Sequence, residues 1–388
     1  MSTMTEVART AAETSEEFTS LSVPTYRGST LIYPSYEAFV KRGRRGRQAY
    51  TYGLYGTPTS RTLAAKLASL EGGTETFIVP SGLMAITTTI LSVVAQGDTV
   101  LLPDTVYTPV RRFAKTTLSK FGVAAAFYDP VDIGSIDFSL PNLRLIWVES
   151  PGSITMEVQD IPAITDHARD HGILVACDNS WASPILCRPL ALGADIVVEA
   201  VTKYLSGHSD VLMGSITVKD DAVAADINDT IRSIGVGVSP DDCFLAIRGL
   251  ESAAVRLAHI ERSALRLAQD VGASDRVSEV FHPALPGFPT HHLWKKQFSG
   301  SSGVFSFVMR DEPEENHADR YGRLRLFKIG ASWGGTHSLL APSPLEQTRT
   351  VNRTHVGKRV IRLSTGLEAS EDLIHDMGRF LSWGPPSL

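Results

Sequence analysis

The sequence predicts an α/β protein, in which a large, mostly parallel sheet covered on both faces by helices precedes a smaller C-terminal α/β domain. Two observations support this prediction. Short, uncharged apolar runs of strand length alternate with segments whose apolar residues recur at helical spacing, which is typical of a parallel sheet. The chain also has 388 residues, so more than one hydrophobic core is expected.

The elements of the first domain follow from apolar spacing and from glycine stops. The first 50 or so residues show no clear period and are predicted to be irregular. From residue 59, Leu63, Leu67 and Leu70 share a helical face that ends at Gly72. Further helices are predicted over 83–94, 111–121 and 161–171, and strands at 77–79, 100–102, 145–148, 174–176 and 196–198.

The C-terminal part begins with a long helical pattern. This pattern runs from about residue 244 to 271 and could link the two domains. Residues 303–308 alternate like a half-buried strand, and residues 360–364 resemble another. We therefore expect a smaller domain from about residue 243 to the end of the chain.

Composition and charge argue against several classes of protein. The net charge of −5 disfavours general nucleic-acid binding, and the basic run at residues 41–47 is interpreted as a solvated loop or a subunit contact. No uncharged apolar run approaches the ~18 residues of a membrane-spanning helix. The first 20 residues lack the apolar stretch of a secretory signal, so a cytoplasmic protein is predicted.

The three cysteines do not predict a metal site or a disulfide. Cys177, Cys187 and Cys243 have neither metal-ligand nor disulfide spacing. We expect each to be a small buried core residue.

The most informative feature is a carboxylate and an amine that end two apolar runs. Asp178 follows one strand-like run, and Lys203 follows the next, 25 residues later; Asp104 and Glu149 lie in similar positions. Ligands of parallel sheets bind beyond the carboxyl ends of the strands. There, Asp178 could pair with the protonated ring nitrogen of pyridoxal phosphate (PLP), and Lys203 could form its Schiff base. The alternatives are a helix cap or ion pair for Asp178 and a surface position for Lys203.

Three further features fit such a site, each with a plain structural alternative. Ser81, Gly82 and Leu83 lie between a strand and a helix, where free N–H groups bind phosphate or where a serine simply caps the helix. Tyr107 could stack on a flat ring or only pack. Arg362 could grip a substrate carboxylate or lie on a solvated strand face.

Taken together, these stretches resemble the Cys/Met-metabolism family of PLP-dependent enzymes. The resemblance extends from about residue 50 to 368. It rests on the ordered motifs YGLYGTPT (52–59), LEGG (70–73), PSG (80–82), ESPGSITMEV (149–158), DNSW (178–181), TKYLSGHSD (202–210) and SWGG (332–335).

The resemblance implies a PLP-dependent fold of type I and a role for each matching residue. Lys203 would be the Schiff-base lysine and later the proton shuttle, Asp178 would bind the ring nitrogen, and Tyr107 would stack on the ring and serve in catalysis. The residues expected to hold the phosphate are Ser81, Gly82, Leu83 and Thr202, and those expected to bind the amino-acid substrate are Arg362, Ser332, Trp333 and Tyr52.

The resemblance also implies an assembly and a division of the chain. The family is usually a homotetramer of dimers that share active sites, with Tyr52 entering the neighbouring subunit's site to act in catalysis. The implied division is an arm contacting the neighbouring subunit (1–55), a PLP-binding domain (56–242) and a C-terminal domain (243–388). No metal, nucleic-acid or membrane partner is implied.

Two stretches favour β-elimination on L-cystathionine over the family's γ-elimination and γ-replacement reactions. These are residues 149–153, where the other members tend to carry a Thr-Asn-Pro type of sequence, and Trp333, where they usually have a leucine-like residue. The alternative is γ-elimination or γ-replacement on a homoserine-derived or specialised amino acid. A non-catalytic binding protein and a nicotinamide dehydrogenase are more distant readings, and the dehydrogenase lacks its Gly-x-Gly-x-x-Gly fingerprint.

One position departs from the family pattern. The family's Tyr-x-Arg motif sends its arginine to the neighbouring subunit's cofactor phosphate, but Leu54 stands here. The nearby arginines that could replace it are Arg44, Arg45, Arg47 and Arg61. Otherwise the affinity for the cofactor would be lower or the substrate a specialised one.

Overall fold

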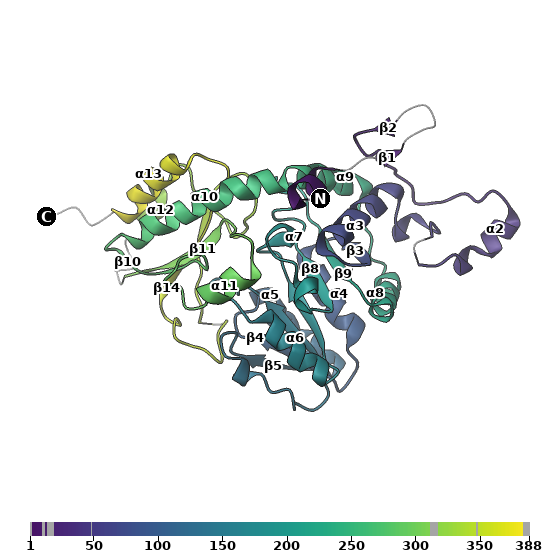
Figure 1. Cartoon of the computed structure of the whole chain (residues 1–388), viewed down its shortest axis with the longest axis horizontal. Coiled ribbons are helices and arrows are strands. Elements are labelled where there is room, and N and C mark those ends of the chain that lie inside the picture. The colour runs from purple at the N-terminus through teal and green to yellow at the C-terminus, as the bar shows by residue number, and fades with distance from the viewer. Residues whose placement is uncertain are drawn as a thin grey trace.

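The computed structural model describes residues 2–9, 12–13, 19–47, 49–310, 317–346 and 348–382. It confirms the α/β fold class. In the described ranges a seven-stranded and a five-stranded sheet stand side by side, and the long helix α10 (Ala253–Gly272) leads from one to the other (Figure 1). Across these ranges, no helix combines the length and the apolar character that a membrane crossing requires.

The large sheet is mostly parallel, as predicted. Its strands lie in the order β3-β9-β8-β7-β6-β4-β5. The five strands from β8 to β5 are parallel, whereas β9 is antiparallel to both neighbours. The bounds are β3 Glu75–Val79, β4 Thr99–Pro103, β5 Ala124–Tyr128, β6 Leu143–Glu149, β7 Leu174–Asp178, β8 Ile196–Glu199 and β9 Gly214–Val218.

Successive side chains of the parallel strands enter different cores, because they alternate between the two faces of the sheet. On β4, Val100 packs in the cluster that contains Ile90 of α4, while Leu101 packs in the cluster that contains Ile164 of α6. Helices therefore cover both faces. Their bounds are α3 Pro58–Glu71, α4 Gly82–Val93, α5 Thr108–Thr116, α6 Ile161–Asp170, α7 Ser183–Leu186 and α8 Asp221–Ile234.

The C-terminal sheet has the order β10-β11-β14-β13-β12 and is antiparallel except for its last pair. Phe305 and Phe307 of β11 pack with Leu267 of α10 and Phe380 of α13. The bounds are α9 Pro240–Glu251, β10 Val277–Phe281, α11 His291–Gln297, β11 Val304–Met309, α12 His317–Gly322, β12 Lys328–Ile329, β13 Leu339–Pro342, β14 Arg359–Ser364 and α13 Ser370–Leu381.

The N-terminal segment holds α1 (Thr3–Ala8), the strand pair β1 (Ala12–Glu13) and β2 (Thr19–Ser20), and α2 (Tyr36–Val40). Figure 1 shows α2 extending away from both sheets. Ile32 and Tyr36 in this region are 95% and 84% exposed, which leaves a large apolar surface uncovered. The predicted arm (1–55) includes residues 1, 10–11, 14–18 and 48, which lie outside the described ranges.

Some predicted elements were wrong in detail. The predicted helix at 244–271 is two helices, because the chain turns at Ser252, whose hydroxyl and N–H both donate to the carbonyl of Gly249. The predicted helix at 111–121 starts at Thr108 and ends at Thr116, followed by a short 3₁₀ turn. Strands β5 and β9 were not predicted. The division at residue 242 stays a prediction, and that position lies inside α9.

Candidate active site

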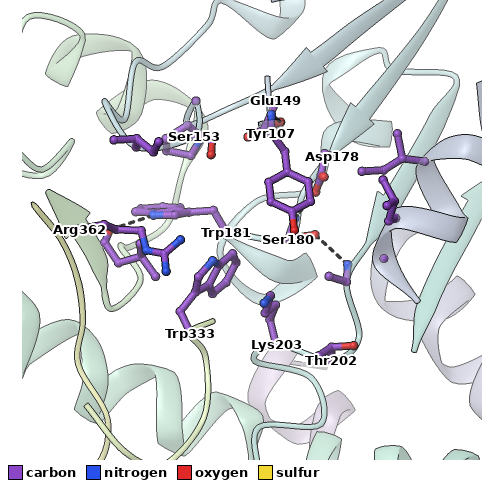
Figure 2. Close-up of a pocket in the computed structure, with 18 of the residues that line it drawn as sticks. Tyr107, Glu149, Ser153, Asp178, Ser180, Trp181, Thr202, Lys203, Trp333 and Arg362 are labelled. Carbon is purple, nitrogen blue, oxygen red and sulfur yellow. Dashed lines mark hydrogen bonds between the residues drawn. The ribbon is translucent and has the colours of Figure 1, made fainter. Parts of the chain in front are cut away.

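A cavity of about 250 Å³ lies where the carboxyl ends of β6, β7 and β8 face the C-terminal sheet. It collects residues that are far apart in the sequence (Figure 2). Its lining includes, from the large-sheet side, Gly82, Leu83, Tyr107, Glu149, Ser153, Asp178, Ser180, Thr202 and Lys203, and from the C-terminal side Val304, Ala331, Trp333 and Arg362.

The amine of Lys203 lies in a partly buried position with few hydrogen-bond partners. Its Nζ donates to Ser332 Oγ at 2.9 Å and lies 5.0 Å from the ring centroid of Trp333. Burial and the positive charge of Arg362 lower the pKa of Lys203 to about 8, against the opposing charge of Asp178. A substantial fraction of the amine is therefore neutral near pH 8, as a nucleophile or a base requires.

Two glycines allow Trp333 to approach Lys203. Gly334 has a φ of +86°, and a Cβ there would lie 2.9 Å from the Cα of Lys203. A Cβ on Gly335 would lie 2.1 Å from Ser209 Oγ. Because glycine occupies both positions, the indole of Trp333 can lie against the loop at residues 203–209. Its ring centroid lies 5.4 Å from that of Tyr204.

Two carboxyl groups end neighbouring strands at the floor of the cavity. Asp178 and Glu149 are register partners on β7 and β6. Burial raises the pKa of Asp178, and hydrogen bonds from Ser180 and the charge of Lys203 oppose this shift. One of these hydrogen bonds runs from the Ser180 N–H to Asp178 Oδ1, at 2.9 Å. Burial and the charge of Asp178 hold the pKa of Glu149 well above its usual range, although Glu149 accepts the Tyr107 N–H at 2.7 Å. A cation in the cavity would satisfy Asp178.

The start of α4 offers free N–H groups to the cavity. Ser81 Oγ accepts the N–H of Met84 at 3.0 Å, whereas the N–H groups of Gly82 and Leu83 have no partner within the helix. A Cβ on Gly82 would lie 2.6 Å from Ala200 Cβ, so only glycine lets the helix begin this close to the end of β8. Such a helix start suits a phosphate group.

Thr202, Tyr107 and Arg362 also lie in the cavity. The hydroxyl of Thr202 donates to Met213 O at 3.1 Å and accepts the Met213 N–H at 2.9 Å, so its contact with a phosphate stays a prediction. The ring of Tyr107 reaches into the cavity (Figure 2), and burial and Glu149 raise the pKa of its hydroxyl. Arg362 Nη2 donates to Ala331 O at 2.7 Å, which holds the guanidinium at the cavity wall.

These residues fit PLP. The unpaired N–H groups at the start of α4 match its phosphate, the buried Asp178 carboxylate matches a protonated ring nitrogen, and the Lys203 amine matches its aldehyde. Most of the residues predicted from the sequence, between Ser81 and Arg362, therefore come together at one place.

Tyr52 and Leu54 lie outside this cavity in the same chain. Tyr52 is 46% exposed, and its ring packs edge-on against Tyr55 at 6.0 Å. Leu54 packs against Gly237. Their predicted roles depend on a neighbouring subunit and stay predictions.

The four arginines that could replace the missing family arginine are in different states. Arg47 forms ion pairs with Glu75, at 3.1 Å, and with Asp221, and Arg61 donates to Tyr55 O at 2.7 Å. Arg44 and Arg45 pair with no carboxylate in the part of the chain that is described. These two remain available to another subunit.

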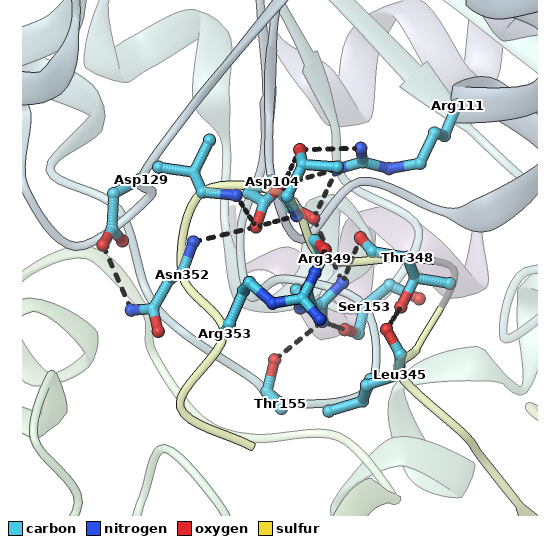
Figure 3. A network of polar contacts seen from close by, with 12 residues as sticks. Asp104, Arg111, Asp129, Ser153, Thr155, Leu345, Thr348, Arg349, Asn352 and Arg353 are labelled. Carbon is cyan, nitrogen blue, oxygen red and sulfur yellow. Dashed lines mark hydrogen bonds and ion pairs between the residues drawn. The ribbon is translucent and has the colours of Figure 1, made fainter. Parts of the chain in front are cut away.

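Asp104 lies at a strand end but does not line the cavity, in contrast to Glu149 and Asp178. Its carboxylate accepts N–H groups of Thr350, Val351 and Asn352 at 2.9–3.1 Å and pairs with Arg111 at 2.6 Å (Figure 3). It therefore attaches the loop at residues 348–352 to the large sheet.

Arg349 continues this contact toward the cavity. It is 4% exposed, and its guanidinium donates to Asp104 O at 3.1 Å, Ser153 O at 2.8 Å and Thr155 Oγ1 at 2.9 Å (Figure 3). We call Asp104, Arg111, Arg349 and Thr350 the polar clamp. The clamp holds residues 153–156, which contribute to a wall of the cavity. These residues belong to the sequence motif at 149–158, but no individual role was predicted for them.

The comparisons with known proteins agree with this site. The profile of the family described as "Cys/Met metabolism PLP-dependent enzyme" matches residues 4–382. A Rhizobium johnstonii protein, provisionally named cystathionine β-lyase, is 42% identical over 361 residues, 92% of this chain and 90% of that protein. The L-alanine/L-glutamate racemase of Wolbachia pipientis is 37% identical over 376 residues, 94% of this chain and 93% of the racemase.

A solved structure shares the whole fold. The crystal structure of cystathionine γ-synthase from Xanthomonas oryzae pv. oryzae, in complex with aminoacrylate and cysteine, has a TM-score of 0.90, 29% identity and 98% coverage of both chains. Relatives from Bordetella avium and Escherichia coli are named cystathionine β-lyase. The chain therefore belongs to the Cys/Met metabolism family of PLP-dependent enzymes.

Proposed function

We propose that this enzyme is a carbon–sulfur lyase that cleaves L-cystathionine by β-elimination to homocysteine, pyruvate and ammonia. The observation that carries the proposal is the position of Trp333, whose indole lines the cavity beside Lys203 (Figure 2). A rigid aromatic wall there restricts how far the substrate side chain bends toward Lys203. The relatives named cystathionine β-lyase support the same reaction.

The residues of the chain divide the work. When bound, PLP supplies an electron-withdrawing ring that stabilises the charge left on the substrate after its α-proton is lost. Arg362 binds the substrate carboxylate, and Ser332 holds the amine of Lys203 beside the α-carbon. Lys203 Nζ accepts the α-proton, and a base placed in this way raises the rate ~10²–10⁴-fold.

The leaving thiolate needs a proton donor. Tyr107 is the candidate within the same chain, because its side chain lines the cavity and a tyrosine hydroxyl is protonated at neutral pH. Tyr52 of a neighbouring subunit is the second candidate. The exposed arm supports a contact between subunits that share sites. We also propose that the enzyme is a cytoplasmic homotetramer built from such dimers.

Two other reactions are supported by relatives of this chain. The fold of a cystathionine γ-synthase aligns over nearly the full length, so γ-elimination or γ-replacement is the second candidate. The racemase relative suggests a third, because an amine that accepts an α-proton can also return one. All three reactions use Lys203 and Arg362, and their products differ.

Product analysis separates them. The purified, yellow enzyme is incubated with L-cystathionine, and the keto acid is identified. We expect pyruvate with homocysteine; 2-oxobutyrate with cysteine would replace the proposal by γ-elimination. A D-amino acid formed from L-alanine, without either keto acid from cystathionine, would favour racemisation.

A Trp333→Leu variant tests the specificity argument. We expect kcat/KM for cystathionine β-elimination to fall about tenfold, the range that a pocket contact of this size contributes, with unchanged visible absorbance. Trp294→Leu, which alters a tryptophan outside the cavity, is the control. If the Trp333 variant keeps wild-type kinetics, Trp333 does not determine specificity.

A further inference from the structure

Two buried carboxyl groups meet beneath the loop that follows Asp178. Glu71 ends α3 and Glu199 ends β8, and each is 2% exposed. The side-chain Nδ2 of Asn179 lies between them, 3.3 Å from Glu71 Oε1 and 3.0 Å from Glu199 Oε1. Neither belongs to the cavity lining, and the proposed mechanism uses neither.

Positive charge is scarce around this pair. In the described ranges neither glutamate forms an ion pair, and Arg188, whose charge acts on Glu71, pairs with Glu6 at 3.5 Å. The other titratable groups that act here are Asp178 and the thiols Cys177 and Cys187, whose ionisation would add negative charge.

Two adjacent buried carboxylates without a cation cannot both ionise at low cost, so one proton between them is the inexpensive state. The pKa values agree with this. Burial raises the pKa of Glu71 to about 7, and burial together with the charge of Glu71 holds the pKa of Glu199 well above its usual range. Glu71 Oε2 is buried and accepts no hydrogen bond, so an ionised Glu71 carboxylate would be costly here.

Asn179 connects this pair to Asp178. Its N–H donates to Val198 O at 2.9 Å, and its carbonyl accepts the N–H groups of Ala182 at 3.1 Å and Ser183 at 2.8 Å. Its side chain also donates to Cys187 O at 3.0 Å. The backbone directly after Asp178 is therefore fixed by a side chain whose acceptors are the two glutamates and the carbonyl of Cys187.

We propose that Glu71 and Glu199 share a proton at neutral pH and that this pair, through Asn179, positions the carboxylate of Asp178. The positioning part rests on the proposed role of Asp178 toward the cofactor, whereas the shared proton stands on the geometry of the pair alone. Asn179 is thus a positioning residue and makes no contact of its own with the cavity.

The shared proton is tested by the unfolding temperature between pH 5 and pH 8. A carboxyl whose folded pKa is raised above its unfolded value of ~4.3 stabilises the fold at low pH and loses that contribution as the pH rises toward the folded value. Glu199→Gln removes one carboxyl whose pKa is raised, and with it the stabilisation that this carboxyl loses as the pH rises. The unfolding temperature of the variant relative to wild type should therefore rise with pH, by on the order of 5 °C.

Two comparisons keep this test decisive. Glu71→Gln should show the same trend, because it also removes one buried carboxyl whose pKa is raised. Glu75→Gln is the control, since Glu75 is similarly buried but pairs with Arg47 at 3.1 Å; its difference from wild type should stay flat over this range. Flat differences in both pair variants would overturn the shared proton.

The positioning of Asp178 is tested by spectroscopy and cofactor affinity. Asn179→Leu removes the donor and should raise the dissociation constant for PLP about tenfold, the loss of one hydrogen bond to a charged group, and shift the visible absorbance. In the double variant Glu71→Gln/Glu199→Gln the amide oxygens still accept from Asn179, so affinity should stay near wild type. Wild-type affinity and spectrum in Asn179→Leu would refute the positioning role. None of these readouts depends on cystathionine turnover, so they fail separately from the proposed function.

Discussion

At the scale of single residues, the environment of Lys203 accounts for the chemistry proposed for it. The amine is partly desolvated and lies near the guanidinium of Arg362, the hydroxyl of Ser332 and the face of Trp333. A surface lysine would be almost fully protonated at pH 7 and would react slowly with an aldehyde.

The lowered pKa of Lys203 predicts a pH dependence for cofactor uptake. In protein stripped of PLP, only the neutral amine attacks an aldehyde, so the association rate should rise about tenfold from pH 7 to pH 9, with a midpoint near 8. Stopped-flow absorbance measures this rate. Lys219→Ala, which changes a lysine bonded to Leu190 O away from the cavity, should leave the profile unchanged. A rate that keeps rising to pH 10 would contradict the lowered pKa.

The residues of the site differ in how far the sequence pattern predicted their roles. Asp178 and Lys203 were predicted because each ends an apolar run, and the sheet brings such ends together. Asp104 carries the same signal but serves the polar clamp, because β4 ends beside the loop at 348–352. A position just past a strand end thus predicts that a residue lies at the carboxyl edge of the sheet. It does not predict whether the side chain faces the cavity.

At the scale of elements, the polar clamp joins β4 to the C-terminal part of the chain. Arg111 on α5 and the loop at 348–352 meet at the single carboxylate of Asp104, which is 0% exposed. Arg349 then reaches the wall of the cavity at Ser153. A buried charge with this many donors is strongly stabilising only while all of them remain in place.

An Asp104→Asn variant should reveal that dependence. We expect the free energy of unfolding to fall by about 3–5 kcal/mol at pH 7, because Arg111 loses its buried partner. Burial raises the pKa of Asp104, but the hydrogen bonds from Thr350, Val351 and Arg111 lower it by more. The net pKa therefore lies below its ordinary value. Its contribution is therefore present above pH ~3.9 and lost as the pH falls.

Denaturant unfolding at pH 7 and at pH 3 measures both effects. The difference between Asp104→Asn and wild type should shrink at the lower pH. Asp137→Asn, at an exposed loop carboxylate that accepts only from Ser139, should change stability by less than ~0.5 kcal/mol. Equal stability of the Asp104 variant and wild type would show that the clamp does not hold the two parts together.

Helices and strands with a clear spacing of apolar residues were predictable from the sequence. Elements whose conformation depends on neighbouring strands or helices were not. The helix of Leu63 and Leu67 and the strand of Leu145 to Val148 have clear apolar patterns. Strand β5 reads Ala124-Ala-Ala-Phe-Tyr128, which is equally compatible with a helix, and it becomes a strand because β4 offers a free edge. The break at Ser252 lies where the helices contact residues 204–206: Arg256 donates to Tyr204 O, and a Cβ on Gly249 would lie 2.0 Å from Ser206 O.

At the scale of the whole molecule, the arm carries apolar side chains that the described part of the chain leaves uncovered. Ile32, Tyr36 and Val40 are more than half exposed on a segment that extends away from the sheets. Tyr52 lies at the base of this segment and away from the cavity of its own chain. Both facts suit a subunit interface in which Tyr52 completes a neighbouring site.

Complementation tests this arrangement. Tyr52→Ala and Lys203→Ala should each be nearly inactive, but co-expressed subunits should form hybrid dimers with one intact site, giving about a quarter of wild-type turnover. A mixture of Lys203→Ala with Arg362→Ala should stay inactive, because both residues lie in one cavity. Absence of recovery in the first mixture would place the action of Tyr52 within its own chain.

The close approach of Gly334 to Lys203 has a consequence for engineering the enzyme. Any side chain at residue 334 meets the lysine backbone, and the left-handed φ adds strain. Random libraries that include this codon would therefore consist largely of inactive clones. A search for new substrates should diversify Trp333 and Ser153, which shape the cavity, and keep the two glycines that follow Trp333 constant.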